Sequence, residues 1–139
     1  MMRVNRHKKA FSLMEVLVTI VVVGTMVSMA IPGFSNFLEK TKSSEGKNIL
    51  LSLLGAQQHW AMDNNGAYTN TLNNLDIKIP QSGNFCNPTV KISNPIASIK
   101  RKNNSGACGA SSLYTLTINT DGTISCIDGS TPICSKISY

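Results

Sequence analysis

A long uncharged segment near the N-terminus limits what this chain can fold into. Between Phe11 and Leu38 the only charged side chain is Glu15, and the window Val16–Phe34 holds nineteen residues without a charge. A helix of that length spans a bilayer core of about 30 Å. A carboxylate at membrane depth costs about 3 kcal/mol by insertion scales. Glu15 therefore needs either a cationic partner or a place among the headgroups, and the residues alone leave both open.

The basic residues are concentrated ahead of this segment. The chain has 13 Lys and Arg against 7 Asp and Glu, a formal net charge of +6. Four of the basic residues, Arg3, Arg6, Lys8 and Lys9, precede Phe11, and without them nine basic and seven acidic side chains remain. Lys and Arg before an apolar span hold that end in the cytoplasm. We therefore expect the rest of the chain to cross to the outside.

The helical pattern continues beyond the uncharged window. From Glu39 to Met62 apolar residues recur every three to four positions, and polar residues occupy the other face. Asn64, Asn65 and Gly66 predict the end of the helix, because Asn and Gly tolerate a left-handed cap. One helix from Phe11 to Met62 would be about 78 Å long. Its second half can pack on a small head, but its first half needs lipid or other copies of itself.

The remaining residues predict a small antiparallel sheet. Residues 113–118 alternate apolar and polar side chains, Asp121-Gly122 suits a tight turn, and residues 123–127 return. Two further short strands are predicted at 90–93 and 96–100. We expect Tyr68, Leu72 and Leu75 of the intervening loop to pack back onto the helix.

The fold class is therefore α+β, with a long N-terminal helix packed on a small antiparallel β-sheet head. We divide the chain into a basic leader (1–10), a membrane-spanning and assembly half of the helix (11–34), and a head (35–139).

Four cysteines lie in the C-terminal half of the chain: Cys86, Cys108, Cys126 and Cys134. An even number of cysteines in a small exported domain favours disulfides, since so small a core often needs covalent support. Three pairings are possible, and spacing does not choose among them. A four-cysteine zinc site is the rival interpretation, but the chain has no C-x-x-C spacing.

Residues 10–15, A-F-S-L-M-E, follow the basic leader and open the apolar helix. In this they resemble the N-terminus of a type IV prepilin, whose pattern is G-F-[ST]-L-x-E. The resemblance is specific from Lys8 to about Pro32. It departs from the family at Ala10, where prepilins nearly always have Gly.

The resemblance implies cleavage at Ala10–Phe11 by a membrane prepilin peptidase, which also methylates the new amine of Phe11. Glu15 would then pair with the N-terminal amine of a neighbouring copy and set the stagger between subunits. Gly24 and Pro32 fall where pilins carry residues that loosen the helix during assembly. The resemblance also implies a C-terminal disulfide loop between Cys126 and Cys134, which leaves Cys86–Cys108 as the second bridge.

The function implied is that of a structural subunit of a surface filament, not an enzyme. Its expected partners are other pilins, the prepilin peptidase, an inner-membrane assembly platform and the membrane itself. We expect no cofactor and no metal. Before assembly the subunit would lie in the inner membrane with its N-terminus cytoplasmic and its head outside; afterwards it would lie in the extracellular filament.

Two alternatives remain at this point. The chain could be a pseudopilin of a type II secretion system. It could also be a secreted soluble protein, since Ser28-Met29-Ala30 is a small-x-small site of the kind that a signal peptidase cuts after. The chain also has one basic cluster, Lys100-Arg101-Lys102, which we interpret as a solvated loop. Nucleic-acid binding is therefore expected to be weak or absent.

Overall fold

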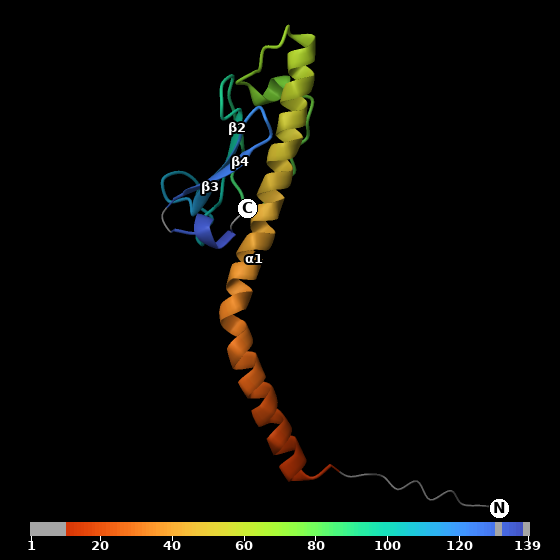
Figure 1. The fold of residues 1–139 in the computed structure, drawn as a ribbon, viewed down its shortest axis with the longest axis vertical. Helices are drawn as coiled ribbons and strands as arrows, with labels where there is room; N and C mark the ends of the chain where they lie inside the picture. The colour runs from red at the N-terminus through yellow and green to blue at the C-terminus, as the bar shows by residue number, and fades with distance from the viewer. Residues whose placement is uncertain (1–10, 130–131, 138–139) are drawn as a thin grey trace, which may run out of the picture. The chain divides into compact units, whose positions relative to one another are not determined.

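The computed structural model describes residues 11–129 and 132–137, and confirms the α+β class (Figure 1). Helix α1 comprises Leu13–Asp63. Four strands follow: β1 (Thr89–Val90), β2 (Ala97–Lys100), β3 (Tyr114–Ile118) and β4 (Ile124–Asp128). Two short 3-10 helices, η1 (Leu72–Asn74) and η2 (Cys134–Ile137), complete the order. The contacts divide the chain into two compact units, one ending at Ser35 and the other beginning at Asn36.

Helix α1 ends where the sequence predicts. Its last residue is Asp63, and the next residues turn the chain through left-handed conformations at Asn65 (φ 54°) and Gly66 (φ 83°). The Gly66 N–H donates to the Ala61 carbonyl at 2.7 Å. This bond satisfies a carbonyl that the helix itself leaves unpaired.

The sheet is a simple antiparallel meander in the order β1-β2-β3-β4. The β3–β4 hairpin confirms the predicted turn, with Gly122 in the left-handed region (φ 85°) and the Asn119 N–H bonded to the Thr123 carbonyl at 3.0 Å. The prediction at 90–93 is wrong in extent, because β1 covers only Thr89–Val90. The chain turns back before Pro95, which has no N–H for a ladder bond.

The core of the head lies between the sheet and the second half of α1 (Figure 1). The helix contributes Ile49, Leu50, Leu53 and Leu54, and the sheet side contributes Ile96, Ala97, Ile99, Tyr114, Leu116 and Ile118. Phe85 is buried with them and meets Tyr114 edge to face at 6.3 Å between centroids. Leu75 is also buried, and Tyr68 and Leu72 pack against the same core, as predicted for the loop after the helix.

A buried amide joins that loop to the helix. Gln57 is fully buried, and its side chain donates to the Thr69 carbonyl at 2.7 Å and accepts from the Thr69 N–H at 3.0 Å. Both the nitrogen and the oxygen of the amide therefore have a hydrogen-bond partner, which offsets the cost of burying them.

Two disulfides close the head. Cys86 pairs with Cys108, and Cys126 pairs with Cys134. This is the pairing that the resemblance implied, and it rules out a cysteine zinc site in the structure. The loop between Cys126 and Cys134 packs tightly at Gly129, where an added Cβ would lie 2.8 Å from the Leu113 carbonyl oxygen.

Two glycines of α1 predict opposite effects on stability. A Cβ at Gly46 would lie 2.7 Å from the Phe85 ring, whereas a Cβ at Gly55 would meet nothing within 4 Å. Gly46→Ala should overpack the core and lower the free energy of unfolding by about 1–3 kcal/mol. Gly55→Ala should raise it by about 0.5–1 kcal/mol, because alanine is the better helix former. Urea unfolding of the detergent-solubilised chain measures both; equal effects of the two substitutions would contradict the packing described here.

Candidate assembly site

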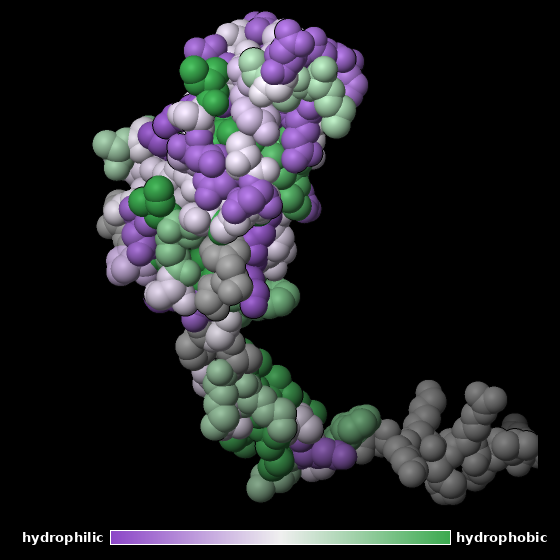
Figure 2. All heavy atoms as spheres, turned by 45° about the horizontal axis from the view of Figure 1, so that its top comes forward, coloured by the Kyte–Doolittle hydropathy of each residue, from purple (hydrophilic) through white to green (hydrophobic). Residues whose placement is uncertain are grey.

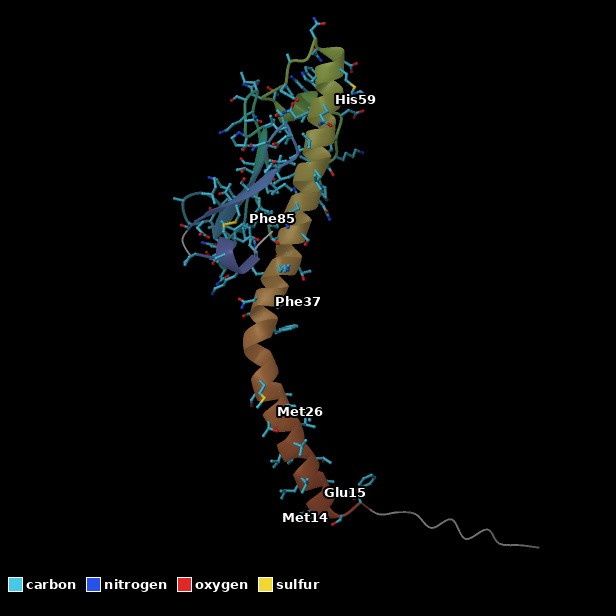
Figure 3. The ribbon with its side chains drawn as sticks, in the orientation of Figure 1. Met14, Glu15, Met26, Phe37, His59 and Phe85 are labelled. Atoms are coloured by element: carbon cyan, nitrogen blue, oxygen red, sulfur yellow. A yellow bond between two sulfur atoms is a disulfide. The ribbon has the colours of Figure 1, made fainter. Side chains whose placement is uncertain are left out.

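The first half of α1 presents its apolar side chains to the surroundings. Phe11 is 78% exposed, Leu13 83% and Met29 84%. Figure 2 shows apolar side chains gathered along this part of the helix, and Figure 3 shows Met14 and Met26 pointing outward from it. The exposed members are Phe11, Leu13, Met14, Val16, Leu17, Val18, Ile20, Val21, Val22, Val23, Met26, Val27, Met29 and Phe34. So much contiguous apolar surface marks a site for lipid or for other protein chains.

Glu15 lies in the first turn of α1 among these apolar residues (Figure 3). Its backbone N–H donates to the Ser12 carbonyl at 3.0 Å, within this first turn. The structure shows no hydrogen bond or ion pair for this carboxylate within residues 11–129 and 132–137. The predicted partner of Glu15 is the α-amine of Phe11, and Phe11 is the first residue that the structure describes. Ala10, on the other side of the predicted cleavage site, lies outside the described residues.

Three hydroxyls of this segment are satisfied by the helix itself. The hydroxyls of Thr19, Thr25 and Ser28 donate to the carbonyls of Val16, Val22 and Gly24, at 2.7, 2.8 and 2.9 Å. Such back-bonding lets a hydroxyl enter an apolar environment without an unpaired donor. Within residues 13–29, Glu15 is thus the polar side chain that does not bond to the helix.

In the part of the chain that the structure describes, no single helix has the length and hydropathy of a membrane span. Two parts of α1, Leu13–Met29 and Gly33–Asp63, have the length and hydropathy of a span only when they are taken together as one bent helix.

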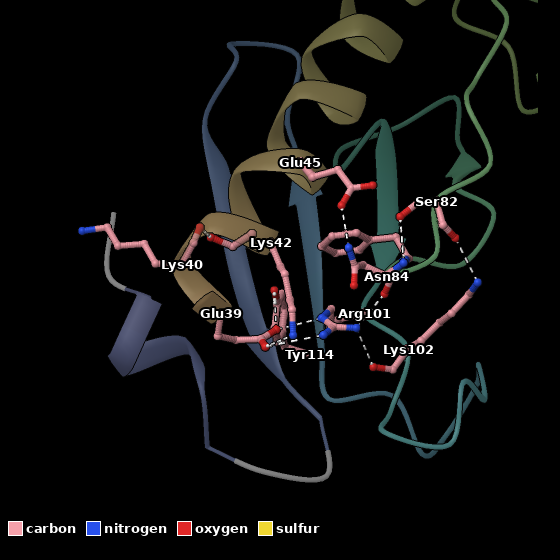
Figure 4. A network of polar contacts seen from close by, with 11 residues as sticks. Glu39, Lys40, Lys42, Glu45, Ser82, Asn84, Arg101, Lys102 and Tyr114 are labelled. Carbon is pink, nitrogen blue, oxygen red and sulfur yellow. Dashed lines mark hydrogen bonds and ion pairs between the residues drawn. The ribbon is translucent and has the colours of Figure 1, made fainter. Parts of the chain in front are cut away.

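A buried ion pair ties the second half of α1 to the sheet. Arg101, directly after β2, donates from Nε to Glu39 of α1 at 2.7 Å, and the two side chains are 8% and 18% exposed. The Arg101 Nη1 also donates to the carbonyls of Asn84 at 2.9 Å and Lys102 at 3.1 Å, and Tyr114 donates its hydroxyl to Glu39 at 3.3 Å. Figure 4 shows this network, in which the Arg101 guanidinium bonds to Glu39 and to the two carbonyls and the Tyr114 hydroxyl bonds to Glu39.

Neighbouring polar contacts extend this network. Asn84 donates from its side chain to Glu45 at 2.9 Å, and Lys102 donates from Nζ to the Ser82 carbonyl at 3.0 Å (Figure 4). The Arg101 guanidinium also lies 5.9 Å from the centre of the Phe85 ring. The network therefore joins α1, the 82–85 segment and the end of β2.

The protonation of Glu39 depends on Arg101. Burial on its own would raise the pKa of Glu39, but the hydrogen bond and charge of Arg101, assisted by Lys42 at 3.5 Å, hold that pKa below its ordinary value of 4.5. Hydrogen bonds from Ser82 and Asn84 likewise lower the pKa of Glu45. Both carboxylates are therefore charged at neutral pH, as the network requires.

These contacts correct the interpretation of Lys100-Arg101-Lys102 as a solvated loop. Arg101 is buried and neutralised by Glu39, and Lys102 is tied to Ser82. Lys100 remains exposed at the end of β2. The cause is that Glu39, which is 62 residues away in the chain, lies beside Arg101 in the fold. Three adjacent charges in the sequence thus do not form a basic patch.

Comparison with known proteins finds similarity to a methylation motif in the N-terminal segment and to a type IV pilin. Residues 5–31 match the family model described as the prokaryotic N-terminal methylation motif. The chain is also similar to the protein named type IV major pilin protein PilA from Myxococcus xanthus (strain DK1622), with 29% identity over 82 residues. That similarity covers 59% of this chain and 36% of the relative, so this chain spans only about a third of the relative's length. No solved structure gives a significant match.

The N-terminal segment thus matches the prokaryotic N-terminal methylation motif, and the chain is similar to a type IV pilin. The methylation motif covers the leader junction and the first half of α1, and the long helix followed by an antiparallel sheet is the pilin-like architecture. A pilin-type protein is a structural subunit and not an enzyme. Within residues 11–129 and 132–137, no group of three or more His, Cys, Asp or Glu side chains is placed to hold a metal ion.

The ion pair of the pilin-like head predicts a stability change that depends on pH. Arg101→Met should lower the free energy of unfolding by about 2 kcal/mol at pH 7, because Glu39 is left partly buried without its cation. Since the folded pKa of Glu39 is lowered, its contribution is complete above the ordinary value of 4.5 and is lost as the pH falls through the folded value. The difference between Arg101→Met and wild type should therefore shrink as the pH falls below 4.5.

Lys42→Met provides the matched control. Lys42 also contacts Glu39, but its side chain is 36% exposed, so its removal should cost less than about 0.5 kcal/mol. Urea unfolding across pH measures both variants. Equal losses of unfolding free energy for Arg101→Met and Lys42→Met would show that the Arg101–Glu39 pair stabilises the head no more than the exposed pair of Lys42 and Glu39 does.

Proposed function

We propose that this chain is a subunit of a type IV pilus-like surface filament that polymerises through the first half of α1. The observation that carries the proposal is a single carboxylate, Glu15, within Leu13–Met29 of α1, where the other exposed side chains are apolar or satisfied by the helix itself. Lipid can accept the apolar side chains but not the charge. A neighbouring subunit can accept both, so assembly is favoured over dispersal in the bilayer.

Cleavage at Ala10–Phe11 would create the partner that Glu15 lacks. The new α-amine of Phe11 lies about one helical turn from the position of Glu15 along the chain. The amine of one copy and the carboxylate of the next would pair across the interface and set the axial stagger between subunits. Methylation of that amine keeps its positive charge, so the pairing survives the modification.

The assembly route follows from the same arrangement. The leader and apolar helix would hold the subunit in the inner membrane with its head outside, where a prepilin peptidase removes residues 1–10. An assembly platform would then move the subunit into the filament. Gly24 lowers helix stability, and Pro32 leaves the Ser28 carbonyl without its helical N–H donor. We propose that α1 stretches between these two residues as it leaves the bilayer.

Two observations favour a surface filament over the alternatives. The disulfide between Cys126 and Cys134 closes the C-terminal end of the head, as in many pilins, which supports a pilus subunit more than a secretion pseudopilin. Helix α1 runs through Ala30 and Ile31. Signal-peptide cleavage there would divide α1 and remove the segment that contains Glu15.

The mature N-terminus is the first prediction of this proposal. Mass spectrometry of the chain purified from cells with a prepilin peptidase should find Phe11 as the first residue, carrying one added methyl group. Ala10→Gly should be processed at least as completely as wild type, because Gly is the smaller residue that prepilins prefer there. A mature chain that begins at Ile31 would identify a secreted protein instead.

The role of Glu15 can be separated from membrane insertion. Glu15→Ala should insert into the membrane as well as wild type, because it removes a charge from an apolar segment. Filament yield after shearing should nevertheless fall about tenfold or more, because the interface loses a charge pair. Thr19→Val is the control: its hydroxyl already bonds within the helix, so yield should change little. Wild-type yield from Glu15→Ala would show that Glu15 merely reaches the headgroups.

A further inference from the structure

A hollow in the head lies between one face of α1 and the segment 77–80. Its volume is about 500 Å³, within the range of about 300–1,000 Å³ that is typical of small-molecule sites. The helix wall runs from Thr41 to Ser52 through positions three or four residues apart, which share one helix face. At 1.5 Å per residue this wall is about 16 Å long. The hollow is therefore long enough for a chain-like ligand.

The apolar lining of the hollow is aliphatic. It consists of Ile49 from α1 and of Ile77, Ile79 and Pro80 from the opposite wall. Ile49 is buried in the core, and Ile77 and Ile79 are half-buried against that core. Apolar surface that borders an open hollow is unfavourable in water, and an aliphatic ligand would cover it.

The hydroxyls that border the hollow are already bonded. Thr41, Ser44 and Ser52 each donate to the helix carbonyl four residues earlier, at 3.0, 3.3 and 2.9 Å. They therefore have no donor left for a ligand. A sugar or a nucleotide needs several hydrogen-bond donors and acceptors from its site, whereas an aliphatic chain needs none.

Two charged side chains also line the hollow, Glu45 and Lys78. The Glu45 carboxylate is engaged, because it accepts a hydrogen bond from the Asn84 side chain at 2.9 Å and is turned toward that residue (Figure 4). Lys78 is exposed, and the structure shows no hydrogen bond or ion pair for its ammonium among the described residues. The charge that remains for a ligand is thus positive and favours an anionic group.

The wall formed by 77–80 is weakly held. In the part of the chain that the structure describes, residues 78–81 make no backbone–backbone hydrogen bond. A second hollow of about 480 Å³ shares Ile77, Ile79 and Pro80 with the first, so this wall borders open space in two places. A segment with few hydrogen bonds and little packing moves at low cost in free energy. The wall can therefore shift to admit a ligand.

We propose that this hollow binds a single-chain anionic amphiphile, such as a fatty acid, with its chain along Ile49, Ile77 and Ile79 and its head group at Lys78. An extended carbon chain advances about 1.3 Å per bond, so a wall of about 16 Å matches a chain of about twelve carbons. The inference goes beyond the proposed function and does not depend on filament formation.

Photolabelling of the full chain in phosphatidylcholine nanodiscs tests the site. A dodecanoic acid that carries a diazirine on its chain should label residues 41–52 and 77–80; labels within 13–34 report probe dissolved in the bilayer. Lys78→Met should reduce labelling of the hollow about threefold, since an exposed charge contributes modestly. Lys91→Met is its control, because Lys91 is exposed but does not line the hollow, and labelling should not change.

A second pair of variants tests the space itself. Ser44→Phe places a ring in the hollow from an exposed helix position and should reduce its labelling about tenfold. Gln58→Phe, at an exposed position of α1 that does not border this hollow, should leave labelling unchanged.

Three further probes with the same diazirine test the ligand class. Dodecanol and dodecylamine should label the hollow less than dodecanoic acid does, because they lack the anion. A phosphatidylglycerol should label only residues 13–34, because its two chains exceed the space. Labels confined to 13–34 for dodecanoic acid, or equal labelling by acid, alcohol and amine, would overturn the inference. Labelling of the hollow by phosphatidylglycerol as strong as that by the acid would also overturn it.

Discussion

The first half of α1 combines exposed apolar side chains with one carboxylate, and the proposed function of the molecule depends on that combination. Apolar surface is unfavourable in water by about 25 cal/mol per Å², so this segment must enter either lipid or a protein assembly. Lipid alone leaves the charge of Glu15 unmet, while an assembly can supply a cation at the same position. In the proposed function, this one acidic residue makes the polymer more favourable than the dispersed subunit.

The head has to fold on the second half of the same helix, and its interactions reflect how little core it has. The apolar residues of α1 from Ile49 to Leu54 pack on a sheet of four short strands. Polar contacts then fix the edges of that packing: Gln57 holds the Thr69 backbone, and Arg101 holds Glu39. Two disulfides restrict the loops that the core does not reach. A small domain supported in this way can remain intact while the first half of α1 changes its environment.

The sequence predicted the features that depend on neighbouring residues. The helix end at Asn65-Gly66 and the turn at Gly122 each follow from local composition, and the structure has both. The disulfide pairing needed the family resemblance, because spacing permits three solutions. Arg101 was misjudged because its partner Glu39 is 62 residues away, and no local pattern reveals a contact of that kind. Gln57 lies buried on the packed face, and its bonds to Thr69 depend on how the loop returns, which no local pattern reveals.

The contact between Glu15 and the Phe11 amine of another copy can be measured in filaments assembled from two separately labelled batches. In one batch the Glu side-chain carboxyl carbons carry ¹³C, and in the other the Phe nitrogens carry ¹⁵N. Solid-state NMR of the mixed filament then detects only contacts between copies. Pairing predicts a dipolar contact between a Glu carboxyl carbon and the methylated amine of Phe11, and Glu15→Gln, whose side chain lacks that label, should abolish it. Well-ordered filaments without that contact would contradict the account.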